Sequence, residues 1–205
     1  MTDFDDSLDG LDFEDENVTD EMRLFVAIRF DDETIDALEA ARDSLFAHAK
    51  AGTPCSRDNL HLTLAFIGEV DEAALFAIED ALDEVTNPLD MDLILSTVGR
   101  FAGRPSKNGK PSGDTWWVGI DDNPALAKLQ RAIENRLRSI GLEFPDHAFK
   151  AHITIGRRVV LEKGVEAGEL ALLEEPIRAH VNAFSLMQTE FIDGKPHYEE
   201  ICSWE

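Results

Sequence analysis

The sequence predicts an α+β fold with two pseudo-symmetric lobes of antiparallel-rich β-sheet, helices on the outside and a central cleft. Three observations predict this class. Strand-like segments are interspersed with amphipathic helical segments, several strand-like segments follow one another directly, and one supersecondary unit recurs. At 205 residues, 43% of them hydrophobic, the chain suffices for one domain or for two small lobes that share a core.

The recurring unit carries a His-apolar-Thr-apolar motif, HLTL at 61–64 and HITI at 152–155. The two histidines are 91 residues apart, and the same offset aligns Phe25 with Trp116, Ile35 with Leu126, Leu38 with Leu129 and Ala41 with Ala132. A strand, a helix and a His-bearing strand thus recur in the same order, which indicates that one unit is used twice. An approximate two-fold axis between the copies would bring the two His strands face to face across a cleft.

Each element of the first half has a local signal. RLFVAIRF is rich in β-formers, acidic residues open the first helix, Ile35 and Leu38 start its apolar stripe, and Asp71 caps the second helix. The predicted elements are a strand over 23–30, a helix over 32–49, a loop over 51–60, a strand over 61–67 and a helix over 71–82.

The second half is equally marked by breakers and caps. Asn123-Pro124 starts a helix and Gly141 ends it, while Asp193-Gly194 is typical of a hairpin turn. The predicted elements are strands over 91–99 and 115–120, a helix over 124–140, a strand over 151–157, a short helix near 166–174, and strands near 178–190 and 196–203.

The net charge of −23 is concentrated at one end of the chain. Residues 1–21 hold ten acidic residues and no Lys or Arg, so the rest of the chain carries −13. We expect residues 1–21 to be a disordered acidic tail that solubilises the protein or docks weakly to a partner, and 22–205 to be the folded domain. This charge excludes an extended basic groove for duplexes but allows a small pocket for one phosphate.

No apolar run of about 18 residues predicts a membrane span, and the acidic N-terminus does not resemble a secretory signal. Cys55 and Cys202 are the only cysteines, and we expect no bridge between them. These features predict a cytoplasmic protein without a membrane partner, and we expect a monomer.

The duplicated motif suits acid–base chemistry on an anion. In a strand, His61 and Thr63 share one face, as do His152 and Thr154, while the intervening aliphatic residues face the core. One imidazole can donate a proton while the other accepts one, and the hydroxyls can bind phosphate oxygens. Arg157 has the opposite parity to His152, so a twist or bulge is needed to turn its guanidinium inward.

This set suits phosphodiester cleavage without a metal or cofactor, since no third ligand stands at metal-site spacing. A separate basic stretch over 100–113 contains Phe101 and Arg104 and has no acidic residue. It is either a substrate contact or a hairpin connection that merely lacks acids. We expect structural roles for the other four histidines, His48, His147, His180 and His197. His147 lies five residues before His152 and could contact it from behind.

The motifs HLTLAFIGEV at 61–70 and HITIGR at 152–157 resemble the 2H phosphoesterase superfamily, and within it the RNA 2′,3′-cyclic phosphodiesterases once called 2′-5′ RNA ligases. RLFVAI at 23–28, the Trp-bearing strand and FSLMQTE at 184–190 match in order, so the resemblance covers roughly residues 22–203. It implies hydrolysis of an RNA-terminal 2′,3′-cyclic phosphate to a 2′-phosphomonoester. It further implies His61 as proton donor, His152 as proton acceptor, and Thr63, Thr154 and Arg157 as phosphate ligands.

Two positions depart from the family pattern. Ala151 replaces the usual Pro before the second histidine, and Val26 replaces an aromatic residue, so we expect Phe25 or Phe101 to stack on a base instead. The alternatives left open are a related 2H enzyme acting on 2′-5′ oligonucleotides or small cyclic nucleotide phosphates, and a non-catalytic nucleotide-binding module. Binding alone does not require two titrating groups, which disfavours the module.

Overall fold

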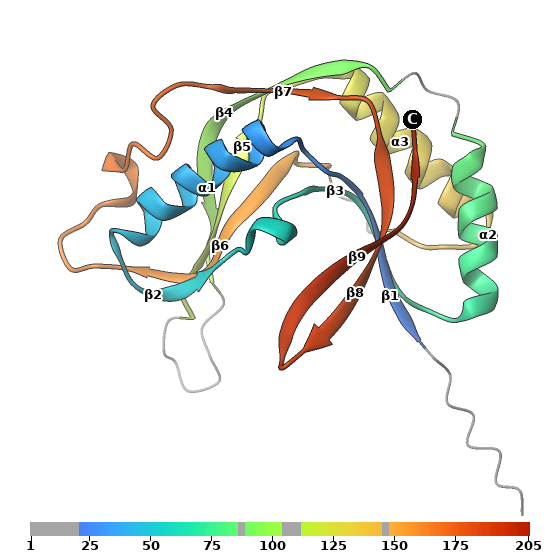
Figure 1. Cartoon of the computed structure of the whole chain (residues 1–205), viewed down its shortest axis with the longest axis horizontal. Coiled ribbons are helices and arrows are strands. Elements are labelled where there is room, and N and C mark those ends of the chain that lie inside the picture. Colours follow the sequence, from blue (N-terminus) through green and yellow to red (C-terminus); the bar gives the residue numbers. More distant parts are fainter. Residues whose placement is uncertain (1–20, 86–88, 104–111, 145–147) are drawn as a thin grey trace, which may run out of the picture.

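The computed structural model describes residues 21–85, 89–103, 112–144 and 148–205, and it confirms the α+β class (Figure 1). The predicted acidic tail, apart from Glu21, lies outside the described residues. The elements are β1 Met22–Ile28, α1 Asp32–Phe46, β2 Ala49–Pro54, η1 Arg57–Asn59, β3 Leu62–Val70, α2 Glu72–Asp83, β4 Met91–Phe101, β5 Asp114–Ile120, α3 Pro124–Ser139, β6 His152–Leu161, η2 Ala167–Glu169, β7 Ile177–Val181, β8 Phe184–Ile192 and β9 Lys195–Trp204.

The strands form one antiparallel sheet in the order β7-β4-β5-β6-β3-β1-β8-β9, with β2 paired to β6 off this path. The two His strands, β6 and β3, meet at its centre through one residue pair, Leu62 with Ile153. The equivalent strands β5 and β1 flank them at mirrored positions. The two predicted lobes are therefore two parts of one curled sheet, here called the His61 half (β3, β1, β8 and β9) and the His152 half (β6, β5, β4 and β7).

The helices brace the two halves against each other. Helix α1 of the first copy packs against β6 of the second, and α3 of the second copy packs against β3 of the first. Each helix is capped as its sequence predicts, because Asp31, Asp71 and Asn123 accept hydrogen bonds from backbone amides of the first turn. Gly141, at φ 95°, follows the end of α3.

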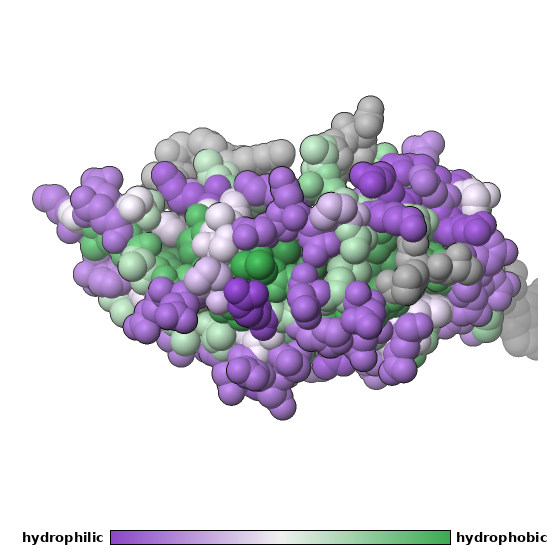
Figure 2. Space-filling model, turned by 90° about the horizontal axis from the view of Figure 1, so that it is seen from above, coloured by the Kyte–Doolittle hydropathy of each residue, from purple (hydrophilic) through white to green (hydrophobic). Residues whose placement is uncertain are grey.

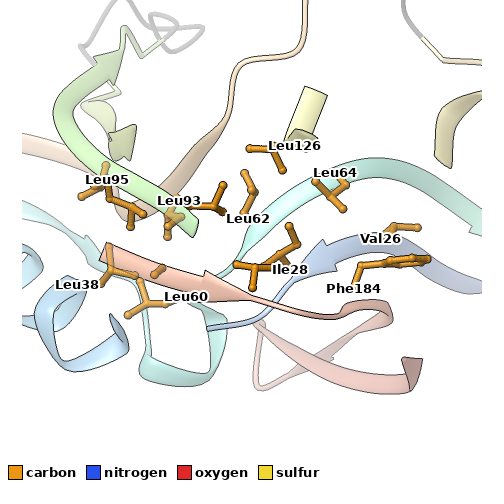
Figure 3. Packing of buried hydrophobic residues seen from close by; sticks show 14 of the residues in the cluster. Val26, Ile28, Leu38, Leu60, Leu62, Leu64, Leu93, Leu95, Leu126 and Phe184 are labelled. Carbon is orange, nitrogen blue, oxygen red and sulfur yellow. The ribbon is translucent and has the colours of Figure 1, made fainter. Parts of the chain in front are cut away.

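One apolar core joins the two copies on the side of the sheet that faces α1 and α3. Leu62 and Ile153, which each follow a histidine, are fully buried. Residues from both copies contribute to the same cluster, among them Leu38, Leu64, Leu95 and Leu126 (Figure 3). Because successive residues of a strand face opposite sides, burial of these aliphatic side chains holds the histidines on the other face of the sheet.

Three predicted elements need correction. The predicted loop over 51–60 overlaps β2, an exposed strand whose composition lacks apolar alternation and which forms only by pairing with β6. The first helix, predicted to reach residue 49, accordingly ends at Phe46. The single strand predicted near 178–190 is two strands, β7 and β8, because the chain leaves β4 and joins β1. The short helix near 166–174 is reduced to the three-residue turn η2.

The repeat also differs by one residue from the sequence offset in its first strand. Val26 pairs with Ala65 and Trp116 pairs with Gly156, so Val26, and not Phe25, is equivalent to Trp116. The segment from Trp116 to its partner Gly156 is one residue longer than the segment from Val26 to its partner Ala65. The offset between equivalent residues is therefore 90 in the first strand and 91 in the His strand. Both cysteines are free. In the described part of the chain, no helix is long and apolar enough to span a membrane.

Candidate active site

The central strand pair brings the two motifs together. Because Leu62 pairs with Ile153 in an antiparallel register, Thr63 lies across from His152, and His61 lies across from Thr154. Residues directly opposite one another in such a pair have Cα atoms about 4.5–5.5 Å apart. All four side chains belong to the face turned away from the core, and all four are half-buried. The register therefore places two imidazoles and two hydroxyls on one small surface.

The backbone orients each ring in the same way. His152 Nδ1 lies 2.7 Å from the carbonyl oxygen of Lys150, and the His61 ring hydrogen-bonds the backbone of Asn59. Asn59 and Lys150 each stand two residues before a histidine, so the repeat preserves this contact. His61 Nε2 lies 3.2 Å from the Thr63 hydroxyl oxygen. When Nδ1 of His152 donates to a carbonyl, its Nε2 is left as the acceptor that a general base requires.

Aromatic rings enclose both histidines, and two of them are the predicted Phe25 and Phe101. The Phe25 and Tyr198 ring centroids lie 4.9 and 5.1 Å from that of His61. Those of Phe101 and Trp117 lie 5.1 and 6.0 Å from that of His152. These contacts restrict the rings of both histidines and remove water from one side of each.

Trp117 can lie beside His152 because its neighbours on the sheet are glycines. A Cβ atom on Gly99 would come within 2.2 Å of the Trp117 ring, and one on Gly119 within 2.8 Å. The Lys150 ammonium stands 4.0 Å from the centroid of the Trp117 ring, close enough for a cation–π contact. Lys150 is exposed, so the His152 half carries a cation beside its histidine.

Burial lowers the pKa of both histidines. The pKa of His61 falls to about 4, first because of desolvation and then because of the positive charges of Arg157 and of His152 when protonated. The pKa of His152 is also lowered, again mainly by burial, with Lys150 and Arg157 adding to the effect. Both rings are therefore neutral near pH 7 in the free protein.

A pair of equivalent bulges turns the fifth residue after each histidine onto the site. Leu64 is the extra residue on β3 opposite Val26 and Ala27, and Ile155 is the extra residue on β6 opposite Trp116 and Trp117. Each bulge is followed by a second buried residue, which reverses the alternation of faces. Arg157 is thereby exposed on the same face as the motifs, and so is Phe66, its equivalent at the offset of 91.

The Arg157 side chain faces a cavity of about 350 Å³ together with His61 and Thr63. The bulge that was needed to turn the Arg157 side chain toward the histidines is therefore present. His152 and Thr154 lie beside this cavity through the β3–β6 register and do not line it. Figure 2 shows the molecule from above, turned by 90° from the view of Figure 1. The face seen there is largely hydrophilic with scattered hydrophobic areas.

Several residues that line the cavity were not predicted from the sequence, and one predicted residue is not described by the structure. Arg104, predicted to contact substrate, lies outside the described residues. The cavity is also lined by Arg23, Phe66, Thr189, Phe191, Pro196 and Tyr198. The offset of 91 from Arg157 would have found Phe66. On β8, Thr189 belongs to the segment FSLMQTE that matches the family, whereas Phe191, Pro196 and Tyr198 lie outside the matched motifs and reach the site because β8 pairs with β1 and β9 pairs with β8. Of the other histidines, His48, His180 and His197 are exposed outside this cavity, and His147 lies outside the described residues.

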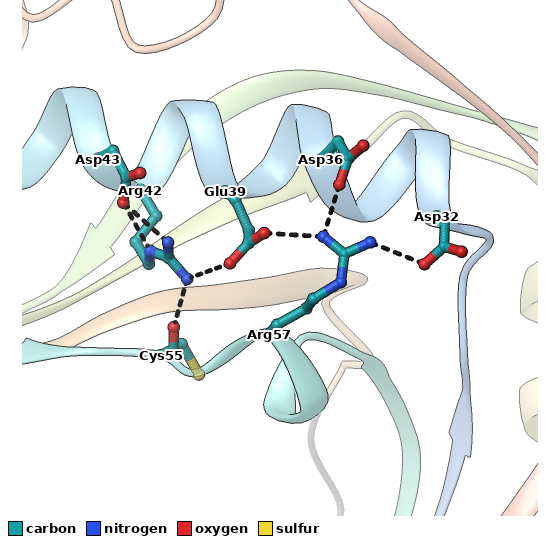
Figure 4. Close-up of polar contacts among 7 residues, drawn as sticks. All are labelled: Asp32, Asp36, Glu39, Arg42, Asp43, Cys55 and Arg57. Atoms are coloured by element: carbon teal, nitrogen blue, oxygen red, sulfur yellow. Dashed lines mark hydrogen bonds and ion pairs between the residues drawn. The ribbon is translucent and has the colours of Figure 1, made fainter.

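The segment that precedes His61 is fixed by ion pairs to helix α1 (Figure 4). Arg57 bonds to three carboxylates on α1, those of Asp32, Asp36 and Glu39. Arg42 shares Glu39 and donates to the backbone carbonyl of Cys55 at 2.9 Å. Isolated surface pairs contribute little, but a shared network orders several side chains at once.

Backbone bonds connect the same segment to both sides of the site. The Cys55 amide donates to the Ile155 carbonyl at 3.0 Å, which links it to the second His strand. Asn59 Nδ2 donates to the Pro196 carbonyl at 2.9 Å, which links it to β9. The position of the His61 ring is thus set by α1, β6 and β9 together.

Comparison with known proteins places this chain in a family. The chain matches the 2′-5′ RNA ligase superfamily over residues 30–191. It is 32% identical over 190 residues to the RNA 2′,3′-cyclic phosphodiesterase of Archaeoglobus fulgidus, covering 90% of this chain and all of that protein. It is 28% identical to the protein of the same name from Thermotoga maritima, covering 90% of this chain and 96% of the relative.

A solved structure agrees with these matches. The crystal structure of Escherichia coli LigT complexed with 3′-AMP is similar, with a TM-score of 0.70 and 26% identity over 90% of this chain and 96% of that one. The chain belongs to the 2′-5′ RNA ligase superfamily, and the predicted resemblance to 2H phosphoesterases is confirmed.

Proposed function

We propose that this protein hydrolyses the 2′,3′-cyclic phosphodiester at the end of an RNA to a 2′-phosphomonoester. The observation that supports this most directly is the shared face on which two histidines, two threonines and Arg157 meet. The names of the Archaeoglobus and Thermotoga relatives support the same substrate class. RNA ends carrying a cyclic phosphate are therefore the proposed partners.

In the proposed mechanism, His152 accepts a proton from a water molecule as that water attacks phosphorus. The bond from phosphorus to the 3′ oxygen breaks, and His61 donates a proton to this oxygen, which leaves a 3′ hydroxyl and a 2′-phosphomonoester. Thr63, Thr154 and Arg157 hold the non-bridging oxygens and offset the charge that develops on them. Proton transfers of this kind typically contribute about 10²–10⁴-fold each.

The low pKa of His152 suits a base, since the ring is neutral before substrate binds. His61 must gain a proton before it can act as an acid, although its pKa in the free protein is about 4. A bound cyclic phosphate is an anion, and an adjacent anion stabilises the imidazolium and raises the pKa of His61. Substrate binding and protonation of His61 therefore promote each other.

The proposed function is tested with an oligoribonucleotide that ends in a 2′,3′-cyclic phosphate, incubated with the full chain in EDTA. We expect conversion to an oligonucleotide ending in a 2′-phosphate, because the proposed residues supply the acid, the base and the phosphate ligands without a metal. Phosphorus NMR distinguishes the 2′-phosphomonoester from the 3′-phosphomonoester, and digestion with a phosphatase distinguishes either monoester from the intact cyclic phosphate. An intact cyclic phosphate, or turnover that requires an added metal, would contradict the proposal.

The lowered pKa values predict an acid-shifted pH dependence. The active form needs His61 protonated and His152 neutral, so kcat/KM should be greatest between their two pKa values, below pH 6.5. Above both values the fraction with protonated His61 falls about tenfold per pH unit. The profile of kcat should lie at higher pH, since bound substrate raises the pKa of His61. Profiles of kcat and kcat/KM that are flat from about pH 5 to 8 would contradict paired acid–base roles.

A further inference from the structure

The two copies of the motif differ in character at one equivalent position. Equivalent bulges expose Arg157 in the second copy and Phe66 in the first, and both side chains line the cavity that contains His61. A guanidinium forms charge-assisted hydrogen bonds with a phosphate, whereas an exposed aromatic ring stacks on a flat, apolar surface. The duplicated fold therefore separates two binding tasks between its halves.

The aromatic character continues along the His61 half, away from the histidine. Phe66 is 50% exposed and Phe191 is 62% exposed, and both line the same cavity. Between them lies Arg23, whose guanidinium carbon stands 5.1 Å from the centroid of the Phe66 ring. Arg23 pairs with Thr189 on β8, and Phe191, two residues further, shares the face of Thr189.

The spacing along this face exceeds the needs of one nucleotide. Phe25 pairs with both Phe66 and Met187, so Phe66 and Met187 lie at one level across β3, β1 and β8. Phe191 lies four positions beyond Met187, a distance of about 13 Å along a strand. Phe25 and Tyr198 already pack on His61, whereas Phe66 and Phe191 keep large exposed surfaces.

The charge of this surface selects an anionic ligand. The described residues that line the cavity include Arg23 and Arg157 and no carboxylate, in a chain whose net charge is −23. Exposed aromatic rings interleaved with cations are the pattern by which proteins hold single-stranded nucleic acid, with bases stacked and phosphates paired. A duplex would need a longer basic surface than two arginines supply.

We propose that the His61 half is a track for single-stranded RNA, in which the terminal base stacks on Phe66 and an upstream base stacks on Phe191. Arg23 pairs with the backbone phosphate between them. This inference rests on the proposed function, and it adds a substrate preference, for oligonucleotides over cyclic mononucleotides, and a direction for the strand. The RNA runs from the reacting phosphate along β1 and β8 toward the turn of the β8–β9 hairpin, which projects at the bottom of Figure 1.

The test compares the Phe191→Ala variant of the full chain on two substrates, adenosine 2′,3′-cyclic monophosphate and a single-stranded octaribonucleotide that ends in the same group. We expect kcat/KM for the octamer to fall about 5- to 100-fold, the effect of losing one stacked base. For the mononucleotide it should change by less than twofold. The matched control is Phe76→Ala on α2, an equally exposed phenylalanine outside the cavity, which should alter neither value.

Equal losses on both substrates, or no loss on the octamer, would overturn the track while leaving the proposed function intact. If the wild type turns over neither substrate, the proposed function fails. The track is then decided separately by fluorescence anisotropy with a labelled octamer ending in a 2′-phosphate. Weaker binding of this octamer to Phe191→Ala than to Phe76→Ala supports the track, and equal binding refutes it.

Discussion

Replacing His61 or His152 by Asn is expected to lower kcat/KM on a cyclic-phosphate oligonucleotide by roughly 10²–10⁴-fold in each case. Each variant removes one of the two proposed proton transfers and keeps a polar side chain in a half-buried position. The double variant should be only slightly slower than the worse single variant, because an acid and a base that act in one step are not additive. Single-turnover rates of the three variants test this directly.

The matched control for these variants is His180→Asn. His180 is exposed and bonds to Asp92 at 3.0 Å, outside the cavity. It should retain the activity of the wild type. If a single His variant loses less than tenfold while its fold is intact by circular dichroism, the paired roles are wrong.

Replacing Arg157 by Gln is expected to lower kcat/KM by about 10²–10³-fold, because the variant lacks the donor proposed to stabilise the negative charge that develops on the phosphate. Arg157→Lys should recover only part of this, since an ammonium cannot bond two phosphate oxygens with the geometry of a guanidinium. Arg157 also lowers the pKa of His61, so its removal should raise that pKa. An NMR titration of the His61 ring in the substrate-free protein measures the change.

The adjacent arginine provides the control, because the chain turns the two side chains apart. Arg158 has a positive φ of 55°, and its guanidinium lies 3.4 Å from the Thr53 hydroxyl on β2. Arg158→Gln should keep full activity. Equal losses in the two Gln variants would show that Arg157 acts only through the general charge of the protein.

The pattern of the sequence was sufficient to predict the two His strands and the duplication. Alternation of polar and aliphatic residues in HLTL and HITI fixes which side chains enter the core, and that rule operates within one strand. Caps such as Asp71 and Asn123 are equally local, since a side chain bonds to an amide two or three residues away. The starts of these elements were therefore predicted to within one residue, whereas both His strands continue further than predicted, to Val70 and Leu161.

Strand pairing decided what local rules could not. Strand β2 has no apolar alternation and exists because β6 offers a partner, and the break between β7 and β8 arises because each pairs with a different strand. Tyr198 and Phe191 reach the cavity from the far end of the chain through the β1–β8–β9 pairing. Phe191 directly follows the segment FSLMQTE, but neither residue belongs to a motif that indicates a role in the site.

By itself, the sequence determined a duplicated α+β chain with paired His-x-Thr strands, because a period of two and helix caps depend only on neighbouring residues. Only the tertiary structure decided where Arg157 and Phe66 point. A bulge forms when one strand has a residue more than its partner, so it depends on two strands distant in sequence. The same pairing across the sheet centre sets each histidine opposite the threonine of the other motif, which makes two motifs into one candidate site.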